Sequence, residues 1–226
     1  MGKVIFIISG GEFGDPAFFN AKAAEKAPAA VICADGGARR LASTALSPTL
    51  IVGDMDSLDP AALARFESQG ARIIRCPREK DETDTELALH EAFAMGPAEI
   101  WIWGALGNRV DHTLANISLL LQGIKRKIGI RLIDSWCELF MLRGKGRAVI
   151  DGEEGQTISL FPWGGKVSGL TLAGFEYPLA KALMEVERPY GISNRLLERR
   201  GVIEVDRGVL LVVRYFRPGS FPGEEK

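Results

Sequence analysis

Two aspartates stand one residue apart at the end of an apolar run. Residues 49–52, TLIV, are typical of a buried strand, and Gly53 leads from them into Asp54 and Asp56. In an extended backbone residues i and i+2 point to the same side, so these carboxylates would repel by roughly 3 kcal/mol at about 5 Å and an effective dielectric near 20. A bound divalent cation would reverse that cost, whereas the alternative is a simple Asx turn that closes the strand.

A second acidic cluster lies at the start of a predicted helix. Thr83 and Glu86 match the capping-box pattern, which makes Asp84 the first helical residue. The acids here stabilise a helix start through its dipole without any ligand. The same helix start also offers free N–H groups to an anion, with Lys80 beside it and Asp84 placed to hold a phosphate-bound metal. Both interpretations are open from the sequence alone.

Two other apolar runs end in glycine with acids nearby. Residues 30–34 lead into Asp35-Gly36-Gly37, and residues 99–103 lead into Gly104 and then an apolar helix near Asp111. As structural alternatives, Asp111 is a helix N-cap and the adjacent His112 a packed or surface ring. Independent surface turns have no reason to place acids repeatedly at strand ends, so a shared site for a polyanion and a metal explains the pattern better.

The elements that position these residues follow from the apolar pattern. From residue 1 to about 137, short apolar runs alternate with helix-like segments, which predicts βα units around a parallel sheet. Asp59, Pro60 and Gly70 mark the start and end of one helix. Ligands bind outside the carboxyl ends of strands in such sheets, which is where the acids fall. The predicted strands are residues 4–9, 30–35, 49–54, 72–76, 99–105 and 130–135.

After residue 138 the pattern changes to short apolar runs with Gly or Pro every few residues, which predicts antiparallel β structure. We place the boundary between an α/β domain, residues 1–140, and a smaller β domain, residues 141–226. The sequence EVDRGVLL predicts a hairpin with its turn at residues 206–208.

Composition excludes several classes of protein. The 226 residues include 28 Lys and Arg against 29 acids, for a net charge of −1, which argues against affinity for nucleic-acid phosphates. With 46% hydrophobic and 25% charged residues, neither disorder nor a membrane protein is indicated. The three cysteines are too far apart for a zinc site or a disulfide framework, which favours a cytoplasmic location. A P-loop is absent, and residues 8–15 do not match GxGxxG.

Five segments in order resemble the thiamine pyrophosphokinase family, also called thiamine diphosphokinase. The segments are ADGGA (34–38), VGDMDSL (52–58), KDETDTELAL (80–89), GALGNRVDHTLANI (104–117) and GISN (191–194). The resemblance implies transfer of the pyrophosphoryl group of ATP to thiamine, giving thiamine diphosphate and AMP, with Mg²⁺. It also implies a mostly parallel, Rossmann-like sheet with flanking helices that holds ATP, followed by an antiparallel β-sandwich that contributes to a thiamine site. The active site is then expected at the subunit interface of a homodimer.

The resemblance also assigns roles to residues. Asp54, Asp56 and Asp84 are expected at the metal-bound triphosphate, and Ser193 and Asn194 at the thiamine pyrimidine. Asp56, Asp84 and Asp111 remain alternatives for the base that deprotonates the thiamine alcohol. Trp163 is a candidate for stacking on thiamine or a core residue. The nucleotide site is expected to contain Asp35, Gly36, Gly37, Lys80, Thr83, Gly104 and Arg109.

Two other functions are compatible with parts of the pattern. A DxD sequence after a strand also holds the metal and diphosphate in nucleotide-sugar glycosyltransferases, which would bind UDP or GDP sugars. A non-catalytic nucleotide- or thiamine-binding module would keep the glycines and GISN but would need no full set of acids.

Overall fold

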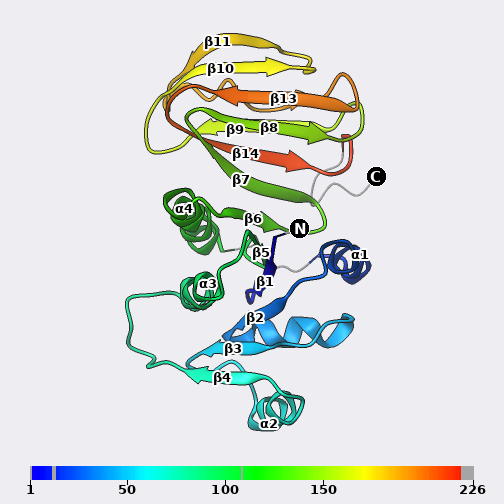
Figure 1. Cartoon of the computed structure of the whole chain (residues 1–226), viewed down its shortest axis with the longest axis vertical. Helices are drawn as coiled ribbons and strands as arrows, with labels where there is room; N and C mark the ends of the chain where they lie inside the picture. The colour runs from blue at the N-terminus through cyan, green and yellow to red at the C-terminus, as the bar shows by residue number, and fades with distance from the viewer. Residues whose placement is uncertain (1, 12–13, 108, 220–226) are drawn as a thin grey trace. The chain divides into compact units, whose positions relative to one another are not determined.

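The computed structural model describes residues 2–11, 14–107 and 109–219 (Figure 1). The chain divides into two units, Met1–Ser135 and Trp136–Lys226. The domain boundary predicted from the sequence lies between residues 140 and 141. It falls inside Cys137–Arg143, which is one continuous strand of the second unit. None of the helices in the described residues is both long and apolar enough to cross a membrane.

The first unit is built on a sheet of six strands that all run parallel. The order across the sheet is β6-β5-β1-β2-β3-β4. Every run predicted as a strand in this part of the sequence is confirmed as one. β1, β2 and β5 are almost wholly buried, as expected for a parallel sheet that is covered on both faces. The strands are β1 (Val4–Ile8), β2 (Ala30–Ala34), β3 (Leu50–Gly53), β4 (Arg72–Arg75), β5 (Glu99–Trp103) and β6 (Gly129–Ile133).

Helices cover both faces of this sheet. Figure 1 shows α3 and α4 on one face and α1 on the other. On the α1 side, the ring of Phe19 packs edge-on against Phe6 of β1 and Trp103 of β5, at centroid distances of 5.9 and 4.8 Å. The helices are α1 (Pro16–Lys26), the 3₁₀ helix η1 (Asp35–Ser43), α2 (Pro60–Ser68), α3 (Asp84–Ala94) and α4 (Val110–Arg126).

The helix signals read from the sequence are confirmed at two helices. In α2, Asp59 accepts a hydrogen bond from the Ala62 N–H at 2.8 Å, and Pro60 is the first helical residue. In α3, the Thr83 hydroxyl accepts from the Glu86 N–H at 3.2 Å. Local side-chain chemistry therefore determines where these helices begin.

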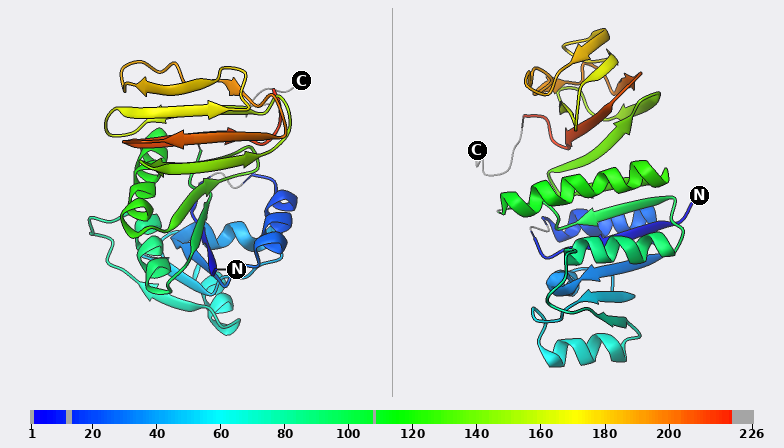
Figure 2. Two further views of the ribbon diagram at one scale, coloured as in Figure 1. Left: turned by 45° about the horizontal axis from the view of Figure 1, so that its top comes forward. Right: turned by 90° about the vertical axis from the view of Figure 1, so that its left-hand side faces the viewer.

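The strand order reverses at β1, which has β5 on one side and β2 on the other. The chain proceeds from β1 to β4 toward one edge, then returns to form β5 and β6 on the opposite side (Figure 2). Loops that follow β1, β2 and β5 therefore emerge next to one another and diverge. This is the topological switch point at which parallel α/β sheets bind ligands.

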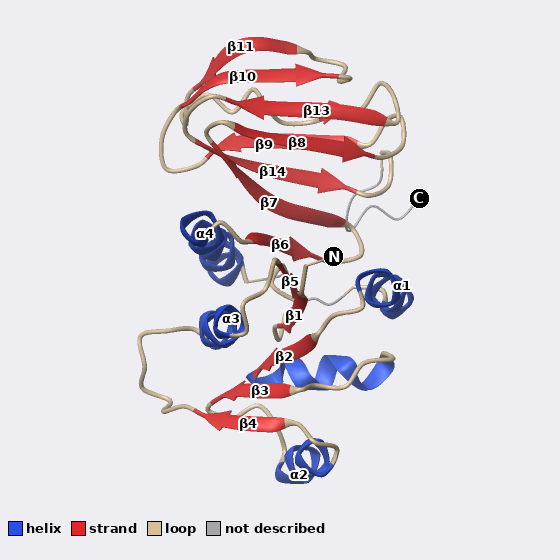
Figure 3. Cartoon of the chain, viewed as in Figure 1, coloured by secondary structure: helices blue, strands red, loops and turns tan. Residues whose placement is uncertain are grey.

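All elements in the described part of the second unit are strands (Figure 3). Four of them pair antiparallel in the order β12-β9-β14-β7, and four others in the order β11-β10-β13-β8. Side chains of both sets, including Leu160, Leu170 and Ile203, form one apolar core, so the predicted β-sandwich is confirmed. The strands are β7 (Cys137–Arg143), β8 (Gly146–Asp151), β9 (Thr157–Pro162), β10 (Val167–Ala173), β11 (Leu179–Met184), β12 (Asn194–Arg195), β13 (Arg200–Val205) and β14 (Val209–Tyr215).

The predicted hairpin at residues 206–208 is wrong. β13 pairs with β8 and β10, whereas β14 pairs with β7 and β9, so the turn crosses from one layer of the sandwich to the other. The N–H groups of Asp206 and Arg207 donate to the Ser168 carbonyl at 3.2 and 3.1 Å. A turn signal of this kind predicts the change of direction but not the partner of each strand.

Candidate active site

A cavity of about 740 Å³ opens at the carboxyl end of the parallel sheet. It is lined by the loops after β1, β3 and β5, by η1 and by the first turns of α3 and α4, all within the first unit. The predicted residues Asp35, Gly36, Thr83, Asp84, Gly104 and Arg109 line it. The concave site therefore lies at the carboxyl ends of the strands, where the sequence analysis placed it, and at the topological switch point of the sheet.

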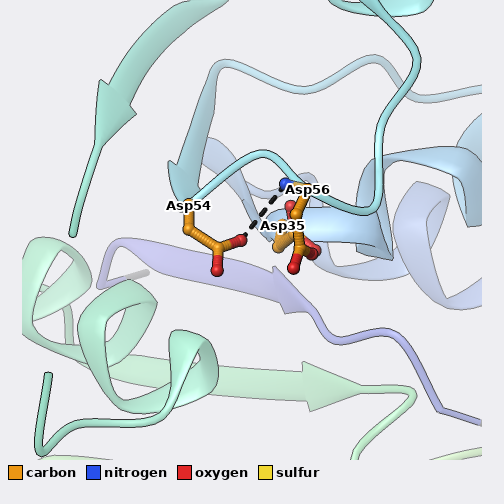
Figure 4. Close-up of side chains that lie close together, drawn as sticks. All are labelled: Asp35, Asp54 and Asp56. Carbon is orange, nitrogen blue, oxygen red and sulfur yellow. Dashed lines mark hydrogen bonds between the residues drawn. The ribbon is translucent and has the colours of Figure 1, made fainter. Parts of the chain in front are cut away.

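Asp35, Asp54 and Asp56 bring one carboxylate oxygen each to within 4.8 Å of one another (Figure 4). Asp35 follows β2, and the other two follow the neighbouring strand β3. Asp35 is buried, Asp54 is half-buried and Asp56 is exposed. The exposed guanidinium of Arg78 lies 3.6 Å from Asp56, a pairing that contributes little in water. Three carboxylates at this separation repel one another unless a cation joins them.

Asp54 and Asp56 converge through a turn rather than through the alternation of an extended strand. β3 ends at Gly53, and Met55 between the two acids adopts a left-handed conformation with φ of 64°. One oxygen of Asp54 accepts a hydrogen bond from the Asp56 N–H at 3.2 Å, so the Asx turn is present. It occupies one oxygen of Asp54 and leaves the other available to a cation.

Asp35 is held in place by its backbone. Its φ is 41°, and a Cβ on Gly53 would lie 2.8 Å from the Asp35 Cβ, so only glycine at 53 allows this approach. Gly37 is required for a similar reason, because a Cβ there would lie 2.1 Å from the Ile8 carbonyl oxygen at the end of β1. Buried Oδ1 of Asp35 has no hydrogen-bond donor among the described residues.

These observations fit a hard divalent cation. A buried carboxylate oxygen without a donor is costly, and a metal ion would satisfy it. The cluster offers only oxygen ligands, which suits Mg²⁺. The structure therefore brings Asp54 and Asp56 together with Asp35, which the sequence analysis had assigned to the nucleotide site.

Asp84 forms an ion pair with Lys80, the lysine that the sequence analysis placed beside this helix start. Its Oδ1 lies 2.8 Å from the Lys80 ammonium, whose side chain is only 13% exposed. Burial alone would lower the pKa of Lys80, but the hydrogen bond to Asp84 and the charges of Asp84 and Asp54 outweigh it and raise that pKa. Lys80 thus links the start of α3 to the carboxylate cluster. Ligation of a metal by Asp84 remains a prediction.

Arg109 and Asp111 form an exposed ion pair at the start of α4. Arg109 Nε and Nη2 donate to the two oxygens of Asp111 at 3.2 and 2.6 Å. These bonds, with one from the His112 N–H, lower the pKa of Asp111 to about 2. The helix begins at Val110 with Arg109 at the capping position, so the alternative of Asp111 as N-cap is wrong. His112 is exposed and lines the cavity.

The residues expected to contact thiamine lie in the second unit. Asn194 is 5% exposed, and its side-chain amide accepts from the Tyr177 N–H at 3.0 Å and donates to the Tyr177 carbonyl at 2.9 Å. Ser193 has a left-handed backbone, and its N–H donates to the Ser159 hydroxyl at 3.0 Å. Asn194 therefore fixes the loop around Tyr177, and the thiamine contacts remain predictions. Trp163 is half-buried.

Several cavity residues were not predicted from the sequence. Two arginines, Arg39 and Arg40, directly follow the ADGGA segment, a position beside Asp35 that could have suggested them. Ser9 hydrogen-bonds through its hydroxyl to Thr85 at 2.9 Å and joins the end of β1 to α3. Asn116 is buried on α4 and donates to the Ala105 carbonyl at 2.8 Å. The only sequence signal for Asn116 is that it is a polar residue within an otherwise apolar helix.

A parallel α/β sheet with an arginine- and carboxylate-lined cavity at its switch point is typical of proteins that bind a nucleotide. Comparison with family models identifies the particular family within this class. The model described as "Thiamin pyrophosphokinase, catalytic domain" matches residues 21–132, and "Thiamin pyrophosphokinase, vitamin B1 binding domain" matches residues 147–210. The chain belongs to the thiamine pyrophosphokinase family.

Known proteins are similar to this one in sequence and in structure over most of its length. Thiamine pyrophosphokinase from Bacillus subtilis is 34% identical over 180 residues, which cover 80% of this chain and 84% of the relative. The crystal structure of a Bacillus subtilis thiamine pyrophosphokinase covers 94% of this chain and 99% of that one, with a TM-score of 0.83 and 32% identity. The enzyme from Geobacillus thermodenitrificans gives a TM-score of 0.80 at 25% identity, covering 96% of this chain and 100% of that one.

These matches confirm the resemblance read from the five segments. They do not support the glycosyltransferase or the non-catalytic module, since both family models and these relatives are thiamine pyrophosphokinases. The chain is accordingly an enzyme of this family.

Replacing Asp35 by Asn tests the carboxylate cluster. We expect the metal-free variant to melt at a higher temperature, because the repulsion between Asp35 and the other two acids is removed, and each kcal/mol gained raises the melting temperature of a chain of this size by about 2–4 °C. The rise in melting temperature that Mg²⁺ or Mn²⁺ causes in the unsubstituted protein should disappear. Thermal unfolding with and without metal measures both effects, and Asp81→Asn, an exposed acid outside the cluster, is the control. Unchanged stabilisation by metal in Asp35→Asn would exclude Asp35 as a ligand.

The ion pair between Arg109 and Asp111 leads to a prediction about the pH at which the Asp111 carboxylate becomes protonated. Because the bonded form of Asp111 is the ionised one, the pair should persist as pH falls and separate only as it approaches about 2. In Arg109→Gln the midpoint should rise toward the ordinary value of about 3.9. Carboxyl-carbon NMR of Asp111 measures this, and an unaltered midpoint in the variant would show that Arg109 does not cause the shift.

Proposed function

We propose that this enzyme transfers the pyrophosphoryl group of ATP to the hydroxyl of thiamine, giving thiamine diphosphate and AMP, and that it requires Mg²⁺. The observation that carries this proposal is the convergence of Asp35, Asp54 and Asp56 beside the cavity at the strand ends. The family membership supports the two substrates.

The three carboxylates would hold the metal ion. When bound there, Mg²⁺ neutralises phosphate charge and fixes the orientation of the phosphate oxygens. Asp54 and Asp56 reach it from the turn after β3, and Asp35 from the first residue of η1. Because Asp35 has a free buried oxygen and a constrained backbone, its carboxylate needs little reorganisation to bind.

The other cavity residues would bind and align the nucleotide. At about 740 Å³ the cavity has the size of a typical small-molecule site. The first turn of α3 presents backbone N–H groups at Thr83, Asp84 and Thr85, which line the cavity and favour an anion. Such a transfer depends on positioning and charge neutralisation more than on covalent chemistry. Among the alternative bases, Asp111 is the weakest because of its low pKa.

We further propose that the enzyme acts as a homodimer in which the second unit of one copy contributes to the thiamine site of the other. Most of the exposed large apolar side chains in the described residues fall between 177 and 197, a segment that contains GISN. An exposed apolar segment of this kind is typical of an interaction surface. Its exposed apolar residues are Tyr177, Leu183, Val186, Tyr190, Ile192 and Leu197. A cytoplasmic location is also proposed, supported by three free cysteine thiols.

Activity is tested by incubating the purified protein with ATP, Mg²⁺ and thiamine and separating the products. We expect AMP and thiamine diphosphate in equal amounts. Asp54→Asn should abolish turnover while retaining the folded protein, because its role is at the metal. Release of ADP, or no product from the unsubstituted protein, would contradict the proposal. Collapse of the melting temperature in Asp54→Asn would instead assign this residue a structural role.

The dimer is tested by placing a charge on the apolar surface. Leu183 is 50% exposed, so Leu183→Asp should fold normally but sediment as a monomer and lose thiamine-dependent turnover. Val149→Asp, at a residue 40% exposed and outside residues 177–197, should leave the dimer intact. Analytical ultracentrifugation distinguishes the states. An unsubstituted protein that is monomeric while active would refute the shared site.

A further inference from the structure

Three arginines line the cavity, and they differ in how far their donors are already used. Arg109 donates hydrogen bonds from Nε and Nη2 to Asp111. Arg40 donates through Nη2 to the Gly10 carbonyl at 3.0 Å. Within the described ranges, Arg39 has neither a carboxylate partner nor a side-chain hydrogen bond, and it is exposed to the cavity. Its planar set of donors is therefore available to a ligand.

The guanidinium of Arg39 lies in the cavity over Gly36, the residue that follows Asp35. A Cβ on Gly36 would lie 3.1 Å from Arg39 Nη2 and 3.0 Å from the Ser57 Cβ. Gly36 directly follows Asp35, and the Ser57 hydroxyl lies 3.1 Å from Asp56 Oδ1 as a hydrogen-bond partner. Arg39 is thus placed over a glycine that follows Asp35 in the chain and lies against Ser57, the hydrogen-bond partner of Asp56.

We propose that Arg39 is a specificity-determining residue that binds the β- and γ-phosphates of the nucleoside triphosphate. This inference rests on the proposed function, because it assumes a nucleotide whose phosphates reach the carboxylates. Three acids surround the expected metal, and a single divalent cation does not neutralise them together with a triphosphate. An uncommitted arginine beside them supplies further positive charge and a fork of donors that matches phosphate oxygens.

The same geometry predicts which part of the nucleotide Arg39 recognises. Since Arg39 is near the acids, it should contact the phosphates held there and leave the nucleoside and α-phosphate untouched. Because it has no acidic partner among the described residues, its removal should leave the fold intact, unlike that of Lys80, which is paired with Asp84.

Calorimetric titration with ATP and with AMP, each with Mg²⁺ and without thiamine, tests the proposal. For Arg39→Met we expect ATP affinity to fall by about ten- to a hundred-fold, the loss of a charged hydrogen bond, with AMP affinity unchanged. Arg39→Lys should be intermediate, because lysine keeps the charge but not the fork. The matched control is Arg72→Met, an exposed arginine of β4 away from the cavity, which should bind both nucleotides normally.

The other possible outcomes separate failure of this inference from failure of the proposed function. Equal losses for ATP and AMP would place Arg39 at the α-phosphate or nucleoside and overturn the inference, as would an unchanged ATP affinity in Arg39→Met. If the unsubstituted protein fails to bind ATP, the proposed function itself fails. Unfolding of Arg39→Met, measured by circular dichroism, would assign Arg39 a structural role and also overturn the inference.

Discussion

The repulsion among three carboxylates is the constraint on which the site depends. Asp35, Asp54 and Asp56 converge within 4.8 Å, and backbone geometry maintains this arrangement. Left-handed φ values at Asp35 and Met55 and the absence of a side chain at Gly53 hold the acids together. Clustering like charges in this way reduces the stability of the metal-free protein. A bound ligand explains the arrangement, because the free energy of binding to the cluster is larger than the stability that the repulsion costs the fold.

The surrounding structure distributes positive charge around this cluster. Lys80 is close to both Asp84 and Asp54, while Arg39 and Arg40 belong to η1 and line the cavity. Because β1 has β2 on one side and β5 on the other, loops from distant parts of the sequence meet at one end of the sheet. The sheet supplies rigidity, and the loops supply charged groups of both signs. Binding a metal and a polyanion together requires this combination.

Much of this could be predicted from sequence because the signals are local. Runs of apolar residues gave all six parallel strands, and Asp59 and Thr83 gave helix starts. Asp35 was assigned to the nucleotide site and not to the metal-binding acids, because its proximity to Asp54 and Asp56 depends on β2 lying beside β3, a long-range pairing that no local pattern encodes. The turn at residues 206–208 was misread for the same reason. Asp111 was considered as an N-cap, but its carboxylate pairs with Arg109 instead.

The most direct test of the carboxylate cluster is a crystal structure of the enzyme with ATP and Mn²⁺, with the metal located by its anomalous scattering. We predict a peak within ligand distance of carboxylate oxygens of Asp35, Asp54 and Asp56, with phosphate oxygens completing the coordination. A metal bound elsewhere, with these three side chains directed into solvent, would contradict it.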